Sequence, residues 1–119
     1  MPLKKQGKLM SLIQKYWKSH ATLARAQAGL VQVPVVVCTD GFEMSVQASE
    51  YHYCSPRETD ISGLYRSWEV GFPTAVDDAL IPYCSELEKP TDTIYSYVPT
   101  AVVDAVIEKH GGLAGSGSV

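Results

Sequence analysis

The residues best suited to chemistry lie in one short run, Tyr-His-Tyr-Cys-Ser-Pro-Arg from Tyr51 to Arg57. A thiol beside an imidazole and a guanidinium could act as a nucleophile, because nearby positive charge favours the thiolate. The guanidinium and the tyrosine rings could instead hold a phosphate and stack on a base or a partner. The third interpretation is a loop pinned by its aromatic residues around an unreactive cysteine. The run lies within residues 49–63, a long irregular connection of the kind that is usually functional or mobile.

Two further features extend this candidate surface. Arg66 could supply a second guanidinium, and the Tyr95-x-Tyr97 pair could form an aromatic platform. If a second layer of structure covers that platform, the pair belongs to the core instead. We therefore predict contacts with a partner or ligand from seven residues: Tyr51, His52, Tyr53, Arg57, Arg66, Tyr95 and Tyr97.

Other catalytic or metal-binding patterns are weak in this chain. Among the cysteines and histidines only His52 and Cys54 are close in sequence, and no pair has the usual spacing of zinc ligands. The acidic pairs lack an opposing acid or base, and Gly111-Gly112 follows a predicted helix instead of opening one. The sequence therefore predicts no metal, no cofactor and no catalytic set.

A β-hairpin is expected around Asp40-Gly41, a strong signal for a two-residue type I′ turn. Residues 31–38 form a β-branched run, and residues 42–48 alternate between apolar and polar types. A two-residue loop would pair Val35 with Val46, so we expect both side chains on one apolar face.

The second half of the chain contains a near-repeat. Residues 73–81 and 99–107 agree at seven of nine positions, and each follows a short β-type run. We therefore predict two strand–helix units, with strands over 64–72 and 94–98 and a threonine capping each helix. The passage from the first of these strands to the second could be a right-handed crossover between parallel strands.

These elements predict an α+β fold: an N-terminal helix, a β-hairpin and two strand–helix units, with a mostly antiparallel sheet and helices packed on one face. Residues 8–28 carry apolar side chains at helical spacing, and we expect Trp17 to cover the rim of the core. The length of 119 residues predicts one domain over 1–112, with 1–7 loose and 113–119 a disordered tail.

Charge and composition indicate the class of partner and the cellular compartment. The net charge is −3, yet six of the ten basic residues precede Asp40 and no acid does. This asymmetry indicates a basic helix on an acidic body, and a contact with nucleic acid is the alternative, through Lys4, Lys5, Lys8, Lys15 and Lys18. No apolar run approaches the ~18 residues of a membrane span. Three cysteines without a CxxC pair suit a reducing compartment, so we expect a cytoplasmic protein with no membrane contact.

Several motifs resemble small uncharacterised accessory proteins of tailed phages and prophages. The resembling motifs are Asp40–Ser49, His52–Arg57, Glu69–Pro73, Tyr97–Pro99 and Ile107–Gly112. The resemblance implies no catalytic residues. It implies a protein that binds and blocks a host protein, for example a defence nuclease such as a CRISPR effector, in the host cytoplasm.

The leading hypothesis for function is therefore a non-enzymatic inhibitor of a host protein. The first alternative is a protein that binds or sequesters a nucleotide or small molecule through Arg57 and Arg66. The second is a cysteine-dependent enzyme that uses Cys54. A homodimer is a further alternative for the partner.

Overall fold

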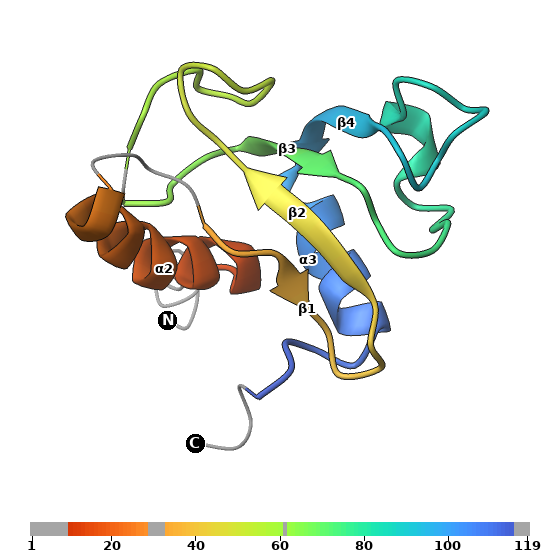
Figure 1. The fold of residues 1–119 in the computed structure, drawn as a ribbon, viewed down its shortest axis with the longest axis horizontal. Coiled ribbons are helices and arrows are strands. Elements are labelled where there is room, and N and C mark those ends of the chain that lie inside the picture. The colour runs from red at the N-terminus through yellow and green to blue at the C-terminus, as the bar shows by residue number, and fades with distance from the viewer. Residues whose placement is uncertain (1–9, 29–32, 61, 116–119) are drawn as a thin grey trace, which may run out of the picture.

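A computed structural model describes residues 10–28, 33–60 and 62–115 of the chain. In this part of the chain two helices and a short 3-10 turn accompany a four-stranded sheet (Figure 1). The elements in chain order are α2 (Leu12–Ala28), β1 (Val36–Val37), β2 (Glu43–Gln47), β3 (Ser67–Gly71), η1 (Ile81–Tyr83), β4 (Ile94–Pro99) and α3 (Thr100–Lys109).

The sheet confirms the predicted α+β class. Its strands follow the order β1-β2-β3-β4, and each neighbouring pair is antiparallel. The parallel crossover between the third and fourth strands is wrong, because β3 and β4 pair antiparallel with Trp68 opposite Val98. The connection between them makes short turns and folds back, so it needs no crossover helix.

The helices pack on one face of the sheet, around a core centred on aromatic residues. Trp17 of α2 packs edge-to-face against Trp68 of β3, with ring centroids 5.5 Å apart, and also against Tyr65. Trp17 has 0% exposure and its Nε1 donates to the Asp60 carbonyl at 3.3 Å, so it lies deeper than the expected rim. Figure 1 shows α3 behind the sheet, and α2 contacts α3 directly.

The start of α2 is fixed by side chains from two sources. Ser11 and Gln14 form a capping box: the Ser11 hydroxyl accepts from the Gln14 N–H, and the Gln14 side chain accepts from the Ser11 N–H. Asp104 of α3 accepts from the Ile13 N–H at 2.9 Å. The carboxylate thus binds a free N–H at the helix start and joins the two helices.

The predicted register of the hairpin is wrong by one residue. Val36 pairs with Met44, and the Gly41 N–H donates to the Cys38 carbonyl, so three residues form the loop instead of two. Gly41 has φ +97°, which matches the three-residue hairpin with a left-handed residue at its end. This shift turns Val35 outward with 45% exposure, while Val46 stays buried. A one-residue slip exchanges the two faces of a strand, and here it buries Val36.

The helix predicted to start at Thr74 is also wrong, and turns with the short η1 replace it. The Thr74 hydroxyl accepts from the Glu43 N–H at 3.0 Å instead of capping a helix. The Asp77 carboxylate accepts from the Ala79 N–H, a local bond that favours a turn. Pro82 then prevents a continuous helix because it has no N–H to donate.

Residues 113–119 were predicted to be a disordered tail, but Leu113 and Ala114 pair with the sheet. Leu113 forms an antiparallel bridge with Cys38, and the Ala114 N–H donates to the Val37 carbonyl at 2.8 Å. This pairing covers part of the outer edge of β1. The rest of the predicted tail, and the predicted loose segment 1–7, lie outside the described residues.

Candidate binding surface

Three of the predicted contact residues form one exposed cluster, here called the aromatic surface: Tyr53, Arg57 and Tyr97. The rings of Tyr53 and Tyr97 lie 6.1 Å apart, and the Arg57 guanidinium lies 5.3 Å from the Tyr53 ring centre. Tyr53 and Tyr97 are 44% and 45% exposed. A cation over an aromatic face is attracted to it, so the arginine and Tyr53 hold each other in place.

A bulge in β4 places Tyr97 on this surface. Val70 pairs with Tyr95 and Trp68 with Val98, so Ser96 and Tyr97 together lie opposite the single residue between Trp68 and Val70. Tyr97 adopts φ +52°, and its N–H donates to the Tyr53 carbonyl at 3.0 Å. The bulge therefore turns the Tyr97 ring outward and ties it to the 49–60 loop.

The bulge also corrects one predicted contact. Tyr95 and Tyr97 were expected to share an exposed face, but Tyr95 has 0% exposure and its hydroxyl donates to the Pro90 carbonyl. The extra residue lets both Tyr95 and Val98 face the core although they are three positions apart. Tyr95 therefore belongs to the core and not to the contact surface.

The remaining predicted residues of the loop flank the aromatic surface. Tyr51 is 81% exposed, and its N–H donates to the Ser49 hydroxyl. His52 contacts the same hydroxyl through Nδ1 at 2.7 Å, and its Nε2 lies 3.9 Å from a carboxylate oxygen of Glu69. Glu69 also accepts weakly from the Tyr53 N–H at 3.4 Å. These side chains fix the backbone of the loop while leaving the Tyr51 ring in solvent.

The second predicted arginine is exposed, with no described side-chain contact to the aromatic surface. Its backbone is held on both sides, because the Arg66 N–H donates to the Ser55 carbonyl and its carbonyl accepts from Thr100. Of the five lysines predicted to contact nucleic acid, two are described. Lys15 and Lys18 lie exposed on α2, and the other three, Lys4, Lys5 and Lys8, lie outside the described residues.

The Cys54 thiol is poorly placed for nucleophilic chemistry. Its exposure is 1%, and it donates to the Ser49 carbonyl at 3.3 Å. Burial raises the pKa of Cys54, so the thiol stays protonated at neutral pH. An activated nucleophile needs an accessible thiolate, and this site offers neither access nor a low pKa.

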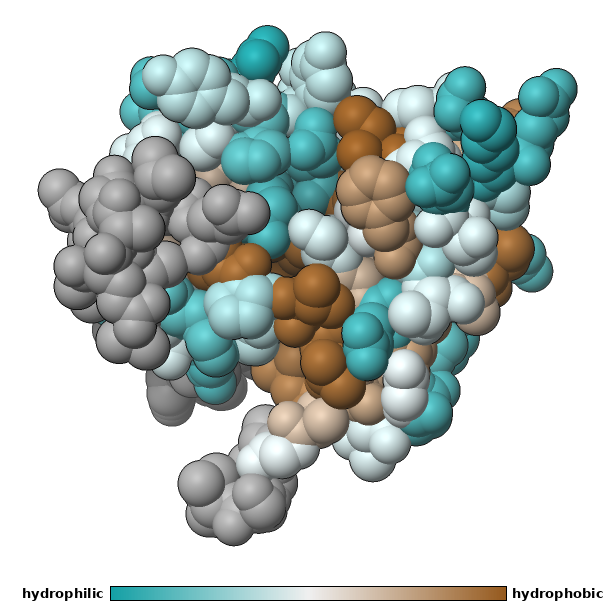
Figure 2. Space-filling model, in the orientation of Figure 1, coloured by the Kyte–Doolittle hydropathy of each residue, from teal (hydrophilic) through white to brown (hydrophobic). Residues whose placement is uncertain are grey.

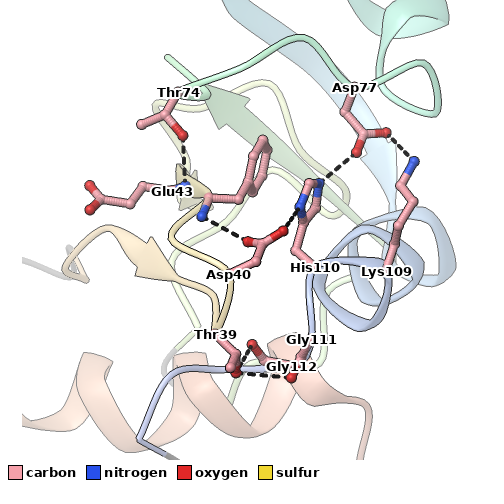
Figure 3. Close-up of polar contacts among 10 residues, drawn as sticks. Thr39, Asp40, Glu43, Thr74, Asp77, Lys109, His110, Gly111 and Gly112 are labelled. Atoms are coloured by element: carbon pink, nitrogen blue, oxygen red, sulfur yellow. Dashed lines mark hydrogen bonds and ion pairs between the residues drawn. The ribbon is translucent and has the colours of Figure 1, made fainter.

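A second polar cluster, which was not predicted from the sequence, lies at the turn of the hairpin (Figure 3). It joins this turn to the end of α3 and to the turns after β3. The His110 ring donates through Nδ1 to Asp40 at 2.7 Å and through Nε2 to Asp77 at 2.9 Å. Lys109 donates to the other oxygen of Asp77 at 2.8 Å, and the Phe42 ring stacks on the imidazole with centroids 4.0 Å apart. We call Asp40, Asp77, Lys109 and His110 the carboxylate–histidine clasp.

Two carboxylates face the two ring nitrogens of His110, which favours the imidazolium because only the protonated ring can donate from both nitrogens. Burial lowers the pKa of His110, but the two carboxylates more than offset it, and the net pKa lies above its ordinary value. Burial likewise acts to raise the pKa of Asp77, and the bonds from Lys109 and His110 bring it below its usual range. The clasp ties α3 to the hairpin and to the turns after β3.

One feature of the sequence could have indicated the clasp. His110 follows the last residue of a predicted helix, where a cation is favoured, but its partners lie 70 and 33 residues away. In the described part of the chain, no three His, Cys, Asp or Glu side chains are grouped so that they could hold a metal ion. Within the same residues, no helix has both the length and the apolar character needed to cross a membrane.

Comparison with known proteins gives no relative for this chain. No protein-family model, no curated protein and no solved structure matches it.

Proposed function

We propose that this protein is a non-enzymatic binding protein that contacts another protein through the aromatic surface. Tyrosine and arginine are the residue types that most often dominate protein–protein binding, because they offer large apolar area together with polar groups. Tyr53, Arg57 and Tyr97 supply these types in one exposed cluster. Tyr51, two residues before Tyr53 in the same loop, is 81% exposed.

The backbone of Tyr97 is the single observation that carries this proposal. A non-glycine residue at φ +52° costs of the order of 1–3 kcal/mol, and such outliers cluster at functional sites. Glycine would adopt this conformation without that cost. Tyr97 is 45% exposed, so packing of its side chain offsets only part of this conformational free energy. A contact made in the complex would account for a tyrosine at this position.

The resemblance to accessory proteins of tailed phages and prophages supplies the class of partner in this proposal. The partner is a host protein in the host cytoplasm, for example a defence nuclease such as a CRISPR effector, which the phage protein blocks by occupying it. The many acids after residue 39 suit such a role, because an acidic surface can occupy a nucleic-acid-binding protein in place of its phosphates.

The test uses purified tagged protein and lysate from the host, with two variants. Arg57→Glu reverses the charge of the aromatic surface, and Lys89→Glu is a matched control on an exposed lysine of another loop. We expect the wild type and the control to recover the same stoichiometric partner, and Arg57→Glu to lose it. Folded wild-type protein that recovers no partner, or equal recovery by all three proteins, would overturn the proposal.

Two measurements separate the alternatives. Thermal unfolding in the presence of a nucleotide panel tests for a small-molecule binder, since a ligand of the folded state raises the Tm. Light scattering tests whether the aromatic surface joins two copies of the chain. A dimer that Arg57→Glu dissociates would make a second copy, and not a host protein, the occupant of this surface.

A further inference from the structure

An apolar groove lies on the molecule away from the aromatic surface, between α2 and the outer edge of β1. The groove is open to solvent along part of its length, and its volume of about 600 Å³ is within the range of small-molecule sites. Figure 2 shows hydrophobic side chains gathered near the centre of one face, over β1. The apolar lining comes from three segments that are far apart in sequence: Leu12 of α2, Val35 and Val37 at the sheet edge, and Leu113 with Ala114 after α3.

The hairpin register creates this groove. Because the loop has three residues, Val35 and Val37 face outward with 45% and 40% exposure instead of entering the core. Leu113 pairs with Cys38 and Ala114 with Val37 of β1, and the two residues close one side of the groove. Tyr16 closes another side, since its hydroxyl donates to the carbonyls of Pro34 and Val35 at 3.0 and 3.1 Å.

The polar groups that line the groove are basic or neutral. Lys15 and His20 line it, one and two turns along α2 from Leu12, and no aspartate or glutamate does. The Lys15 ammonium forms no ion pair with any described residue. The His20 Nδ1 donates to the Tyr16 carbonyl at 2.9 Å, which leaves Nε2 as the nitrogen available to a ligand.

We propose that this groove binds an amphiphile with one apolar chain and one carboxylate, the chemistry of a medium-chain fatty acid. The alkyl chain lies along Leu12, Val35, Val37 and Leu113, where it removes exposed apolar surface from water. The carboxylate pairs with Lys15, the groove cation that has no acid of its own among the described residues. The complementarity of charge selects a carboxylate over an alcohol or an amine with the same chain.

The first experiment titrates hexanoate, octanoate and decanoate into the full chain, each below the concentration at which it forms micelles. Proton–nitrogen correlation spectra locate the site by the amide signals of Leu12, Val35, Val37 and Ala114. We expect the Kd to fall by about two- to fourfold for each added methylene, because each methylene buries further apolar surface. No saturable shift at these amides with decanoate would overturn the proposal and leave the groove to a macromolecular partner.

The second experiment reverses the charge of the groove. Lys15 is exposed, so Lys15→Glu should fold normally; we expect it to weaken decanoate binding by about fivefold and to prefer decylamine. Lys89→Glu carries the same charge change outside the groove and should keep the wild-type preference. Equal affinity for decanoate, decanol and decylamine in the wild type, or an unchanged preference in Lys15→Glu, would overturn the proposal. Self-association through the groove, seen as a dimer that Val37→Asp dissociates, would also overturn it.

Discussion

The substitution Asp77→Asn tests the carboxylate–histidine clasp most directly, because it removes a charge while keeping the shape of the side chain. In the folded protein one oxygen of Asp77 accepts from Lys109 and from the Ala79 N–H, and the other accepts from the Nε2 of His110. If the amide oxygen keeps the first role, the amide nitrogen must face Nε2. Two donors then meet, unless His110 gives up its Nε2 proton.

The cost of Asp77→Asn therefore depends on pH. At acidic pH His110 is an imidazolium, and the variant loses a bond between two charged groups, one of which is 2% exposed in its side chain. Hydrogen bonds to charged groups contribute about 1.5–3 kcal/mol, so we expect the free energy of unfolding to fall by about 2 kcal/mol. Above the pKa of His110 the neutral ring can accept from the amide. The remaining cost is the Lys109 ion pair, which is half exposed and contributes about 1 kcal/mol or less.

Urea denaturation measures this difference, with the fluorescence of the two buried tryptophans, Trp17 and Trp68, as the probe. The series runs from about pH 5 to about pH 9, the range in which histidines titrate. Asp78→Asn is the matched control, since Asp78 is adjacent, exposed and outside the clasp. A cost of Asp77→Asn that does not change with pH, or that grows as pH rises, would refute the assignment of His110 as an imidazolium between two carboxylates.

Three further predictions follow from the same structure. The pKa of His110 is raised on folding, so its contribution to stability is complete below about pH 6.5 and disappears as pH rises through its folded pKa. Urea denaturation of the wild type over this range measures the effect, and a rise in stability with pH would contradict it. Gly63→Ala should lower the free energy of unfolding by about 2 kcal/mol, because Gly63 has φ +80° and a Cβ would lie 3.0 Å from the Gln14 carbonyl oxygen and 3.0 Å from Trp17. An unchanged Tm in thermal unfolding would show that this contact relaxes. Iodoacetamide should modify Cys54 more slowly in the folded protein than in urea, because the thiol is buried and its pKa is raised. Peptide mass spectrometry measures the two rates of modification, and equal rates would contradict the buried position.

Exposure was predicted correctly for Tyr53 and Arg57 in the loop, and wrongly for Tyr95 beside the bulge. Tyr53 and Arg57 lie in an irregular loop, and polar neighbours along the loop keep them at the surface. Tyr95 and Tyr97 were expected to share a face because side chains alternate along a regular strand. The bulge breaks this alternation, and it depends on the pairing of β4 with β3, which no local pattern in residues 94–98 contains.

The hairpin shows the same limit. Asp40-Gly41 correctly marks the position of the turn, since a residue with positive φ was needed there. The choice between a loop of two residues and a loop of three was decided by what the strands pack against. Val35 and Val36 are both β-branched and apolar, so the sequence contained no preference for burying one over the other.

The sequence by itself determined the class of the fold, the number of strands, the last helix and the irregular loop that carries the aromatic residues. These follow from local periodicity and turn residues, which act over a few positions of the chain. The predicted cap by Thr100 is wrong, because Pro99 precedes the helix without a capping bond and the Thr100 hydroxyl donates to the Tyr65 carbonyl. Only the tertiary structure decided the strand register, the outward position of Tyr97, the clasp around His110 and the groove beside β1. Each of these joins residues tens of positions apart, and the free energy that selects them comes from packing and hydrogen bonds that exist only after the chain has folded.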